Sequence, residues 1–291
     1  MRRHLAVADL ARDRRFVRVP LEERFKDPRP AFGGGGGAYG AGAGEDTGRP
    51  SGRRLTPDAP NAPDSARTLM HGIFVGEIQA LEGAGRTCYD FDTGEGPEEV
   101  PFAMKLDMAR QCWDEARHVE ISVKLTEHMG SEVGEFSEQT FLFEAACNAD
   151  PVLRLTGVNR ALEGLAIDVF NTMREYGNTV SDPVLYFCED WMLADEVTHV
   201  KMGSDWLRRI TAKDKERQQR ALEFQRTVDK LFSLGGFRGE SDESPVHLAR
   251  KFRSMAGFSD DEIVELVDVA AEALRDAEAM MSAASGETPA A

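Results

Sequence analysis

The chain has 291 residues, of which 51 are Asp or Glu and 35 are Lys or Arg, so its formal net charge is −16 at pH 7. Phosphate binding depends on clustered Lys and Arg, and the acidic balance therefore argues against a nucleic-acid partner. We find no run of about 20 apolar residues that could span a bilayer, and the first residues lack the apolar centre of a secretion signal. These features predict a cytoplasmic protein with no membrane contact.

Residues 1–65 differ in composition from the rest of the chain. Eight of the twelve residues from Gly33 to Gly44 are glycines, and a Pro- and Asp-rich stretch follows. Such a segment cannot bury enough apolar surface to offset its conformational entropy, which predicts a flexible N-terminal arm without a core.

The remainder is expected to be all-α. Prolines at 101, 151 and 183 lie near the starts of three predicted helices, where proline is tolerated because the first helical N–H groups have no partner in the helix. The predicted bundle covers residues 66–210, with residues 131–150 crossing its length, and residues 211–291 are expected to form helices that pack on it. The predicted helices are 66–92, 101–130, 151–177, 183–210, 213–234, 245–256 and 260–283.

Two short motifs occur twice, each at an offset of 81 residues. The tetrapeptide Ala80–Gly83 (Ala-Leu-Glu-Gly) returns as 161–164, and an Asp-Glu-x-x-His motif ending at His118 returns ending at His199. A duplicated pattern at fixed spacing indicates two superimposable helical hairpins. The six candidate metal ligands are Glu82, Glu115, His118, Glu163, Glu196 and His199.

Glu and His three residues apart on a helix lie about 60° apart around its axis, so both can reach one metal ion. The apolar residues around the motifs place these groups on the same stripes as core positions, which predicts four carboxylates and two imidazoles inside one bundle. Buried carboxylates without compensation would take up protons rather than stay charged. Two divalent cations would neutralise four carboxylates.

With these motifs the chain resembles the ferritin-like di-iron carboxylate superfamily, over roughly residues 66–210. Its Asp114–His118 motif (Asp-Glu-Ala-Arg-His) is similar to the Asp-Glu-x-Arg-His signature of bacterial di-iron monooxygenases, whereas the second copy has Thr198 in place of the Arg. The resemblance is closest to an uncharacterised bacterial family of ferritin-like proteins. It implies a ferritin-like four-helix bundle with extra C-terminal helices.

The resemblance also implies roles for individual residues. Glu115 and Glu196 would bridge two irons, Glu82 and Glu163 would be terminal ligands, and each histidine would bind one iron. Asp114 would hydrogen-bond His199, and Asp195 would hydrogen-bond His118. Manganese, or one manganese and one iron, could replace two irons because the ligands accept both.

Two further residues have alternative interpretations. Tyr89 is either a redox or pocket residue near the metals or a packed core tyrosine. Where soluble monooxygenases have a threonine, four residues after Glu163, this chain has Ile167, and the neighbouring Asp168 is either a substitute or a surface residue.

The leading hypothesis for function is a non-haem di-iron oxidase or oxygenase that uses dioxygen to hydroxylate, desaturate or N-oxygenate a small organic substrate. An external electron donor and a homodimer are compatible with it. One alternative is a ferroxidase or peroxide-handling protein. Another is a non-catalytic protein whose metals stabilise a partner-binding bundle.

Overall fold

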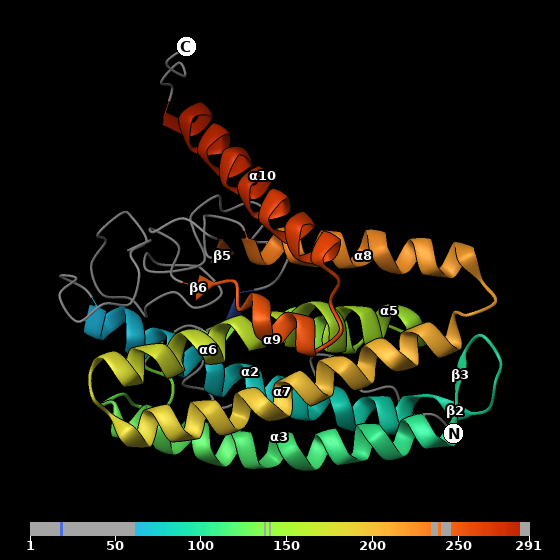
Figure 1. Cartoon of the computed structure of the whole chain (residues 1–291), viewed down its shortest axis with the longest axis horizontal. Helices are drawn as coiled ribbons and strands as arrows, with labels where there is room; N and C mark the ends of the chain where they lie inside the picture. Colours follow the sequence, from blue (N-terminus) through green and yellow to red (C-terminus); the bar gives the residue numbers. More distant parts are fainter. Residues whose placement is uncertain are drawn as a thin grey trace.

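The computed structural model describes residues 18–19, 62–136, 138–139, 141–233, 238–239 and 246–285. Nearly all of the arm expected over residues 1–65 lies outside these ranges. The described part is predominantly helical, which confirms the all-α prediction (Figure 1). Among the described helices, none combines the length and the apolar character needed to cross a membrane.

Four long helical segments pack side by side and form what we call the helical core (Figure 1). In the first hairpin α2 packs against α3, and in the second α6 packs against α7, while α2 also contacts α6 and α3 contacts α7. The third segment is continuous but changes from α to π geometry and back. The four segments of the helical core are α2 (Ala62–Asp90), α3 (Phe102–His128), the third segment and α7 (Pro183–Ile210). The third segment consists of α5 (Pro151–Leu155), the π-helix η2 (Thr156–Leu162) and α6 (Glu163–Thr179).

Local sequence explains where two of these segments begin. Asp150 and Asp182 are the N-cap residues of α5 and α7, each followed directly by a proline at the first helical position. The Asp150 carboxylate accepts a hydrogen bond from the Val152 N–H at 2.8 Å, and the Asp182 carboxylate accepts from Val184 and Leu185. These caps satisfy N–H groups that have no partner within the helix.

The connections and the C-terminal region complete the fold. The short helix α4 (Phe141–Ala146) lies in the connection between the hairpins, and α8 (Lys215–Ser233) packs on η2 and on α10 (Asp260–Ser285). The helix expected over 245–256 begins only at Arg250, as α9 (Arg250–Met255). In the described part of the chain, two-residue parallel strands form three pairs: β1 (Arg18–Val19) with β4 (Glu138–Gln139), β2 (Asp92–Thr93) with β3 (Glu99–Val100), and β5 (Arg238–Gly239) with β6 (Val246–His247).

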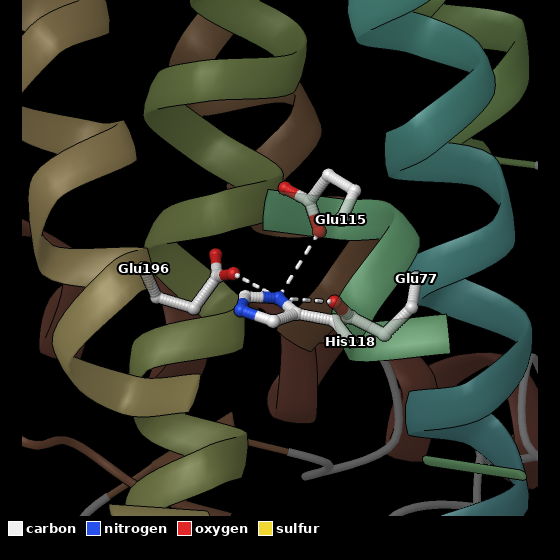
Figure 2. A group of neighbouring side chains, drawn as sticks. All are labelled: Glu77, Glu115, His118 and Glu196. Carbon is white, nitrogen blue, oxygen red and sulfur yellow. Dashed lines mark hydrogen bonds and ion pairs between the residues drawn. The ribbon is translucent and has the colours of Figure 1, made fainter. Parts of the chain in front are cut away.

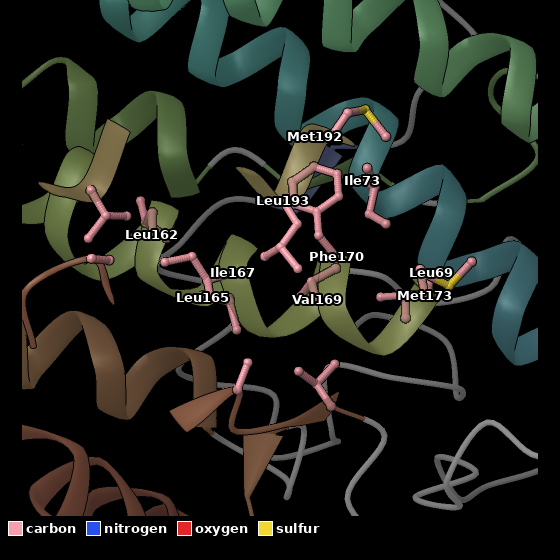
Figure 3. Packing of buried hydrophobic residues seen from close by; sticks show 14 of the residues in the cluster. Leu69, Ile73, Leu162, Leu165, Ile167, Val169, Phe170, Met173, Met192 and Leu193 are labelled. Carbon is pink, nitrogen blue, oxygen red and sulfur yellow. The ribbon is translucent and has the colours of Figure 1, made fainter. Parts of the chain in front are cut away.

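Two apolar clusters lie on either side of a polar centre along α3. Met104 and Met108, near the start of α3, belong to the smaller cluster, and Leu125, near its end, belongs to the larger one. Figure 3 shows the packing of the larger cluster, in which α2, α6 and α7 contribute side chains such as Ile73, Phe170 and Leu193. Burial of this apolar surface stabilises the helical core and holds the charged residues between the clusters in place.

Candidate metal centre

Six buried side chains from four helices meet inside the helical core. They are Glu77 of α2, Glu115 and His118 of α3, Glu163 of α6, and Glu196 and His199 of α7. These residues form two groups that share Glu115 and Glu196, and within each group the potential ligand atoms lie within 4.8 Å of one another. Figure 2 shows the first group, in which the carboxylates surround the ring of His118.

The two shared carboxylates lie between the two histidines. Glu115 has one oxygen 3.2 Å from Nδ1 of His118 and the other 3.1 Å from Nδ1 of His199. Oε1 of Glu196 lies 3.4 Å and 3.5 Å from the same two nitrogen atoms. Glu77 contacts only the His118 side, at 2.9 Å, and Glu163 only the His199 side, at 3.4 Å. The arrangement therefore has two shared and two terminal carboxylates.

Glu77 occupies the position in this cluster that the sequence repeat assigned to Glu82, which corrects that expectation. The Glu77 side chain is buried, at 5% exposure, whereas Glu82 is half-buried and belongs to neither group of potential ligands among the described residues. Five residues along an α-helix correspond to a rotation of about 140°. The two glutamates therefore point to different sides of α2.

The reason lies in the links within the two hairpins. Residues 91–101 join α2 to α3 and include β2 and β3, whereas only residues 180–182 join α6 to α7. Glu163 precedes Glu196 by 33 residues. Because the link between α2 and α3 is longer, Glu77, the α2 residue level with Glu115, precedes Glu115 by 38 residues. Equal spacing in sequence therefore does not correspond to equal position in space. Glu82 matches Glu163 in its tetrapeptide motif but not in its place in the helical core.

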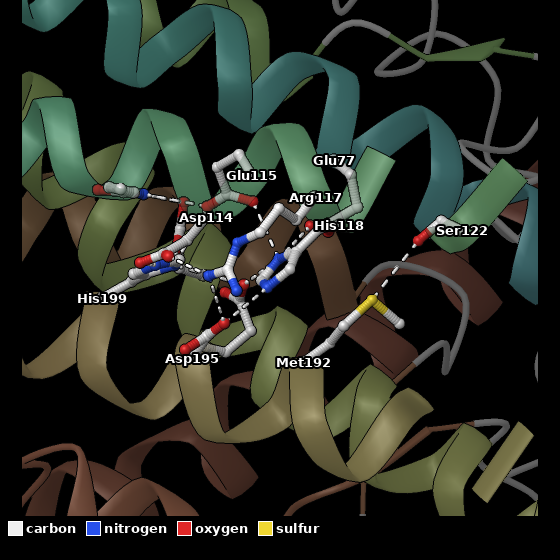
Figure 4. Close-up of polar contacts among 12 residues, drawn as sticks. Glu77, Asp114, Glu115, Arg117, His118, Ser122, Met192, Asp195 and His199 are labelled. Carbon is white, nitrogen blue, oxygen red and sulfur yellow. Dashed lines mark hydrogen bonds and ion pairs between the residues drawn. The ribbon is translucent and has the colours of Figure 1, made fainter. Parts of the chain in front are cut away.

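The two aspartates before the shared glutamates contact the histidines as expected. Asp195 lies 3.3 Å from Nε2 of His118, and Asp114 lies 3.3 Å from Nε2 of His199. Arg117, which the sequence analysis left without a role, donates hydrogen bonds to both aspartates (Figure 4). A carboxylate on Nε2 fixes the tautomer and orientation of each ring, so that Nδ1 faces the cluster.

The pKa values of the clustered side chains are shifted by burial and by the charges of their neighbours. Burial, and after it the charge of Glu115, raises the pKa of Glu77, while burial and the charge of Glu196 raise the pKa of Glu163. Although burial acts in the opposite direction, hydrogen bonds and charges from the surrounding carboxylates raise the pKa values of His118 and His199. Against burial, the two histidines lower the pKa of Glu115. These shifts reflect the cost of holding several ionised carboxylates together, a cost that bound cations would lower.

The donor atoms fit divalent metal ions. One oxygen each of Glu115, Glu163 and Glu196, together with Nδ1 of His199, is buried and makes no hydrogen bond of good geometry among the described residues, although Nδ1 lies 3.1–3.5 Å from the three carboxylates. Unsatisfied buried polar atoms are costly, and these four belong to one cluster. Carboxylate oxygens and imidazole nitrogens suit iron, manganese and zinc. The buried Glu/His groups could therefore hold metal ions, with Glu115 and Glu196 placed to serve two.

A hydrogen-bonded amide pair supports the cluster from the side of Glu163. Gln111, fully buried one turn before Glu115, donates a hydrogen bond from Nε2 to Glu163 at 2.7 Å, and its Oε1 accepts one from Asn159 at 2.7 Å. Asn159 lies in the π-helix η2, directly before α6. Sequence reasoning missed both residues, although Gln111 is four residues before a candidate ligand and thus on the same helix face.

Glu189 was also missed. It is fully buried on α7, two turns before Glu196, and neither of its carboxylate oxygens has a hydrogen-bond partner among the described residues. Burial raises its pKa well above the ordinary value for glutamate, although the nearby charge of His118 acts in the opposite direction. Its seven-residue spacing from Glu196 was the available signal, because residues seven apart share a helix face.

Two residues with open interpretations are not part of the cluster. Tyr89 is 63% exposed and lies about 18 Å along α2 from Glu77, so neither the redox nor the core interpretation holds. Asp168 is fully buried and pairs with Arg253 of α9, with Nε of Arg253 2.9 Å from Oδ1. It therefore anchors the C-terminal region to α6 and is neither a surface residue nor a free acid.

The structure thus defines an all-α protein with a buried Glu/His cluster that could bind metal. Residues 49–264, which include the whole helical core, match the family described as "Protein of unknown function (DUF455)", and the chain belongs to this family. Comparison with curated proteins and with solved structures gives no match.

Proposed function

We propose that this protein is a ferritin-like dimetal carboxylate protein and that it acts as an oxygen-dependent oxidoreductase. The observation that carries the proposal is the pair of residue groups sharing Glu115 and Glu196. Two helices each supply one terminal glutamate and two helices each supply a Glu-x-x-His pair, which is the ligand arrangement of di-iron and di-manganese carboxylate bundles.

The protein residues have defined tasks in this proposal. Two redox-active divalent cations, when bound, supply electrons for the reduction of dioxygen and positive charge that stabilises reduced oxygen. His118 and His199 present Nδ1 to the cluster because Asp195 and Asp114 hold Nε2. Gln111 holds Glu163 in one orientation, and the apolar clusters on both sides exclude bulk water.

The leading reaction is hydroxylation, desaturation or N-oxygenation of a small organic substrate. In a hydroxylation, one atom of dioxygen enters the substrate and the other leaves as water, with two electrons from an external donor and two protons from solvent. The test is anaerobic loading with Fe(II), exposure to dioxygen with a chemical reductant, and mass spectrometry of a cell extract before and after. A gain of one oxygen or a loss of two hydrogens in an extract component, absent in Glu115→Ala and Glu196→Ala, supports the proposal. Unchanged turnover in these variants contradicts it.

A second candidate is a ferroxidase or peroxide-handling protein. The limited space beside the carboxylates favours it, because a cavity lined by Glu77, Glu163 and Glu196 measures only about 40 Å³. The discriminating experiment omits the extract and supplies Fe(II) with dioxygen or hydrogen peroxide alone. Many turnovers of Fe(II) per chain under these conditions support the ferroxidase, whereas a single oxidation of the bound metal supports the organic substrate.

A further inference from the structure

An apolar pocket between α2, α4 and α6 opens onto the carboxylates of the cluster. Glu77, Glu163 and Glu196 line one side, and Leu142 of α4 and residues of α6 such as Val169 line the rest. The two histidines are not among the lining residues. The pocket is therefore on the glutamate side of the centre.

Gly76 lines this pocket. It lies in the middle of α2, one residue before Glu77, and a Cβ atom built at this position would meet no atom within 4 Å. Glycine in a helix interior is unfavourable relative to alanine, so its presence is normally explained by close packing or a special backbone angle. Neither applies here, because Gly76 has no close neighbour and no positive φ.

Two other glycines show the contrasting case. A Cβ at Gly83 would lie 3.1 Å from Ala146, and one at Gly164 would lie 3.0 Å from the ring of Phe258. Both positions are therefore explained by close packing of α4 and of the C-terminal region against the helical core. Gly76 instead borders empty space next to a candidate metal ligand.

The size of the pocket limits what it accepts. An apolar cavity of about 150 Å³ binds benzene, which corresponds to about 25 Å³ for each carbon atom. The pocket beside Glu77 measures about 40 Å³, enough for about two non-hydrogen atoms. Its apolar lining favours a molecule without hydrogen-bonding groups, because a polar group would lose its bonds to water on entry.

We propose that Gly76 and this pocket form a binding site for a slim apolar group, either dioxygen or the end of an unbranched alkyl chain, and that aromatic rings are excluded. The inference rests on the proposed function only in saying which group would reach the metal centre. The cavity and its selectivity do not depend on bound metal and are tested separately.

Methyl NMR of the full chain, with xenon and benzene as apolar probes, tests the site itself. Xenon should shift the methyl signals of Leu142, Leu165 and Val169 in the wild type, with at least tenfold weaker binding in Gly76→Leu. Gly85→Ala, on the same helix but outside the pocket, is the matched control and should bind xenon normally. Equal xenon binding in Gly76→Leu, or benzene binding at the same methyl groups, overturns the proposal.

Oxidation of Fe(II)-loaded protein then distinguishes the two occupants. If dioxygen enters here, Gly76→Leu should consume it at least tenfold more slowly with unchanged iron content. If an alkyl end enters here, consumption by Gly76→Leu should be normal, and n-pentane should alter the rate only in the wild type. Identical behaviour of both proteins in both assays overturns the proposal. If the protein binds xenon but holds no metal, the proposed function fails while the pocket proposal stands.

Discussion

Gln111 donates a hydrogen bond to Glu163 at 2.7 Å, although the two residues are 52 positions apart and belong to different hairpins. At the corresponding position of α7, four residues before Glu196, stands Met192, which accepts a hydrogen bond from Ser122 and contacts no ligand carboxylate through such a bond. The two halves of the centre are therefore chemically different despite the repeated motifs.

This difference predicts unequal effects of two matched substitutions. Gln111→Met removes the donor to Glu163 and leaves Asn159 without its acceptor, so the affinity of the Glu163–His199 site for metal should fall about 10- to 100-fold. Met192→Leu should leave both affinities unchanged. Titration with Mn(II) in competition with a chelator measures both variants. Equal loss from both substitutions would contradict the asymmetry.

Metal binding should release protons. The pKa values of Glu77, Glu163, His118 and His199 are raised, so these groups hold their protons more tightly than ordinary side chains do, and a protonated group must lose its proton to become a ligand. Calorimetry of Zn(II) binding in buffers of different ionisation enthalpy should therefore show a net release of protons as the metal binds. Affinity should rise with pH. Release of less than one proton would contradict this account of the cluster.

Buried His71 should give the fold a separate pH dependence. Burial lowers its pKa from 6.5 to about 4, although the charge of Glu135 acts in the opposite direction. The unfolded chain therefore binds this proton more readily than the folded one. The contribution of His71 to the free energy of unfolding is complete above pH 6.5 and should fall by about 3 kcal/mol as the pH falls to 4. His71→Gln, which keeps an acceptor for the Gly134 N–H, should lack this part of the dependence in urea unfolding at each pH. Parallel pH profiles of the two proteins would contradict the assignment.

Glu189 should destabilise the fold. It is fully buried without a hydrogen-bond partner among the described residues, and such a group costs about 1–3 kcal/mol. Because its pKa is raised in the folded state, the cost grows as the pH rises from the ordinary glutamate value towards the folded one. Glu189→Leu should therefore increase the free energy of unfolding, and more so at pH 8 than at pH 4. A Leu variant less stable than the wild type at pH 8 would show that the carboxyl has a stabilising contact.

Local signals predicted the helices well. Proline and aspartate at the starts of α5 and α7 act through nearby backbone atoms, so their effect is readable from the sequence. The Glu-x-x-His pairs were predictable for the same reason, since three residues on a helix have fixed geometry. The Asp-to-His contacts came from the resemblance, and the structure places them as expected.

Features that depend on the relation between helices were not predictable in this way. The identity of the α2 ligand depends on the length and shape of the link at residues 91–101, which the 81-residue repeat does not reveal. On α2, Ile73 and Glu77 are buried, whereas Glu82, which the repeat selected, is half-buried. The π-helix that carries Asn159 has no distinct sequence signal.

The metal content of Glu77→Ala and Glu82→Ala tests the central claim most directly. The two substitutions remove the same side chain from the same helix, five residues apart, and both proteins can be reconstituted with Fe(II) or Mn(II) and measured by elemental analysis. If Glu77 is the terminal ligand, Glu77→Ala should lose most of one of two bound ions and Glu82→Ala should retain both. The claim would be contradicted if Glu77→Ala retained two ions while Glu82→Ala lost one, or if the wild type bound no metal.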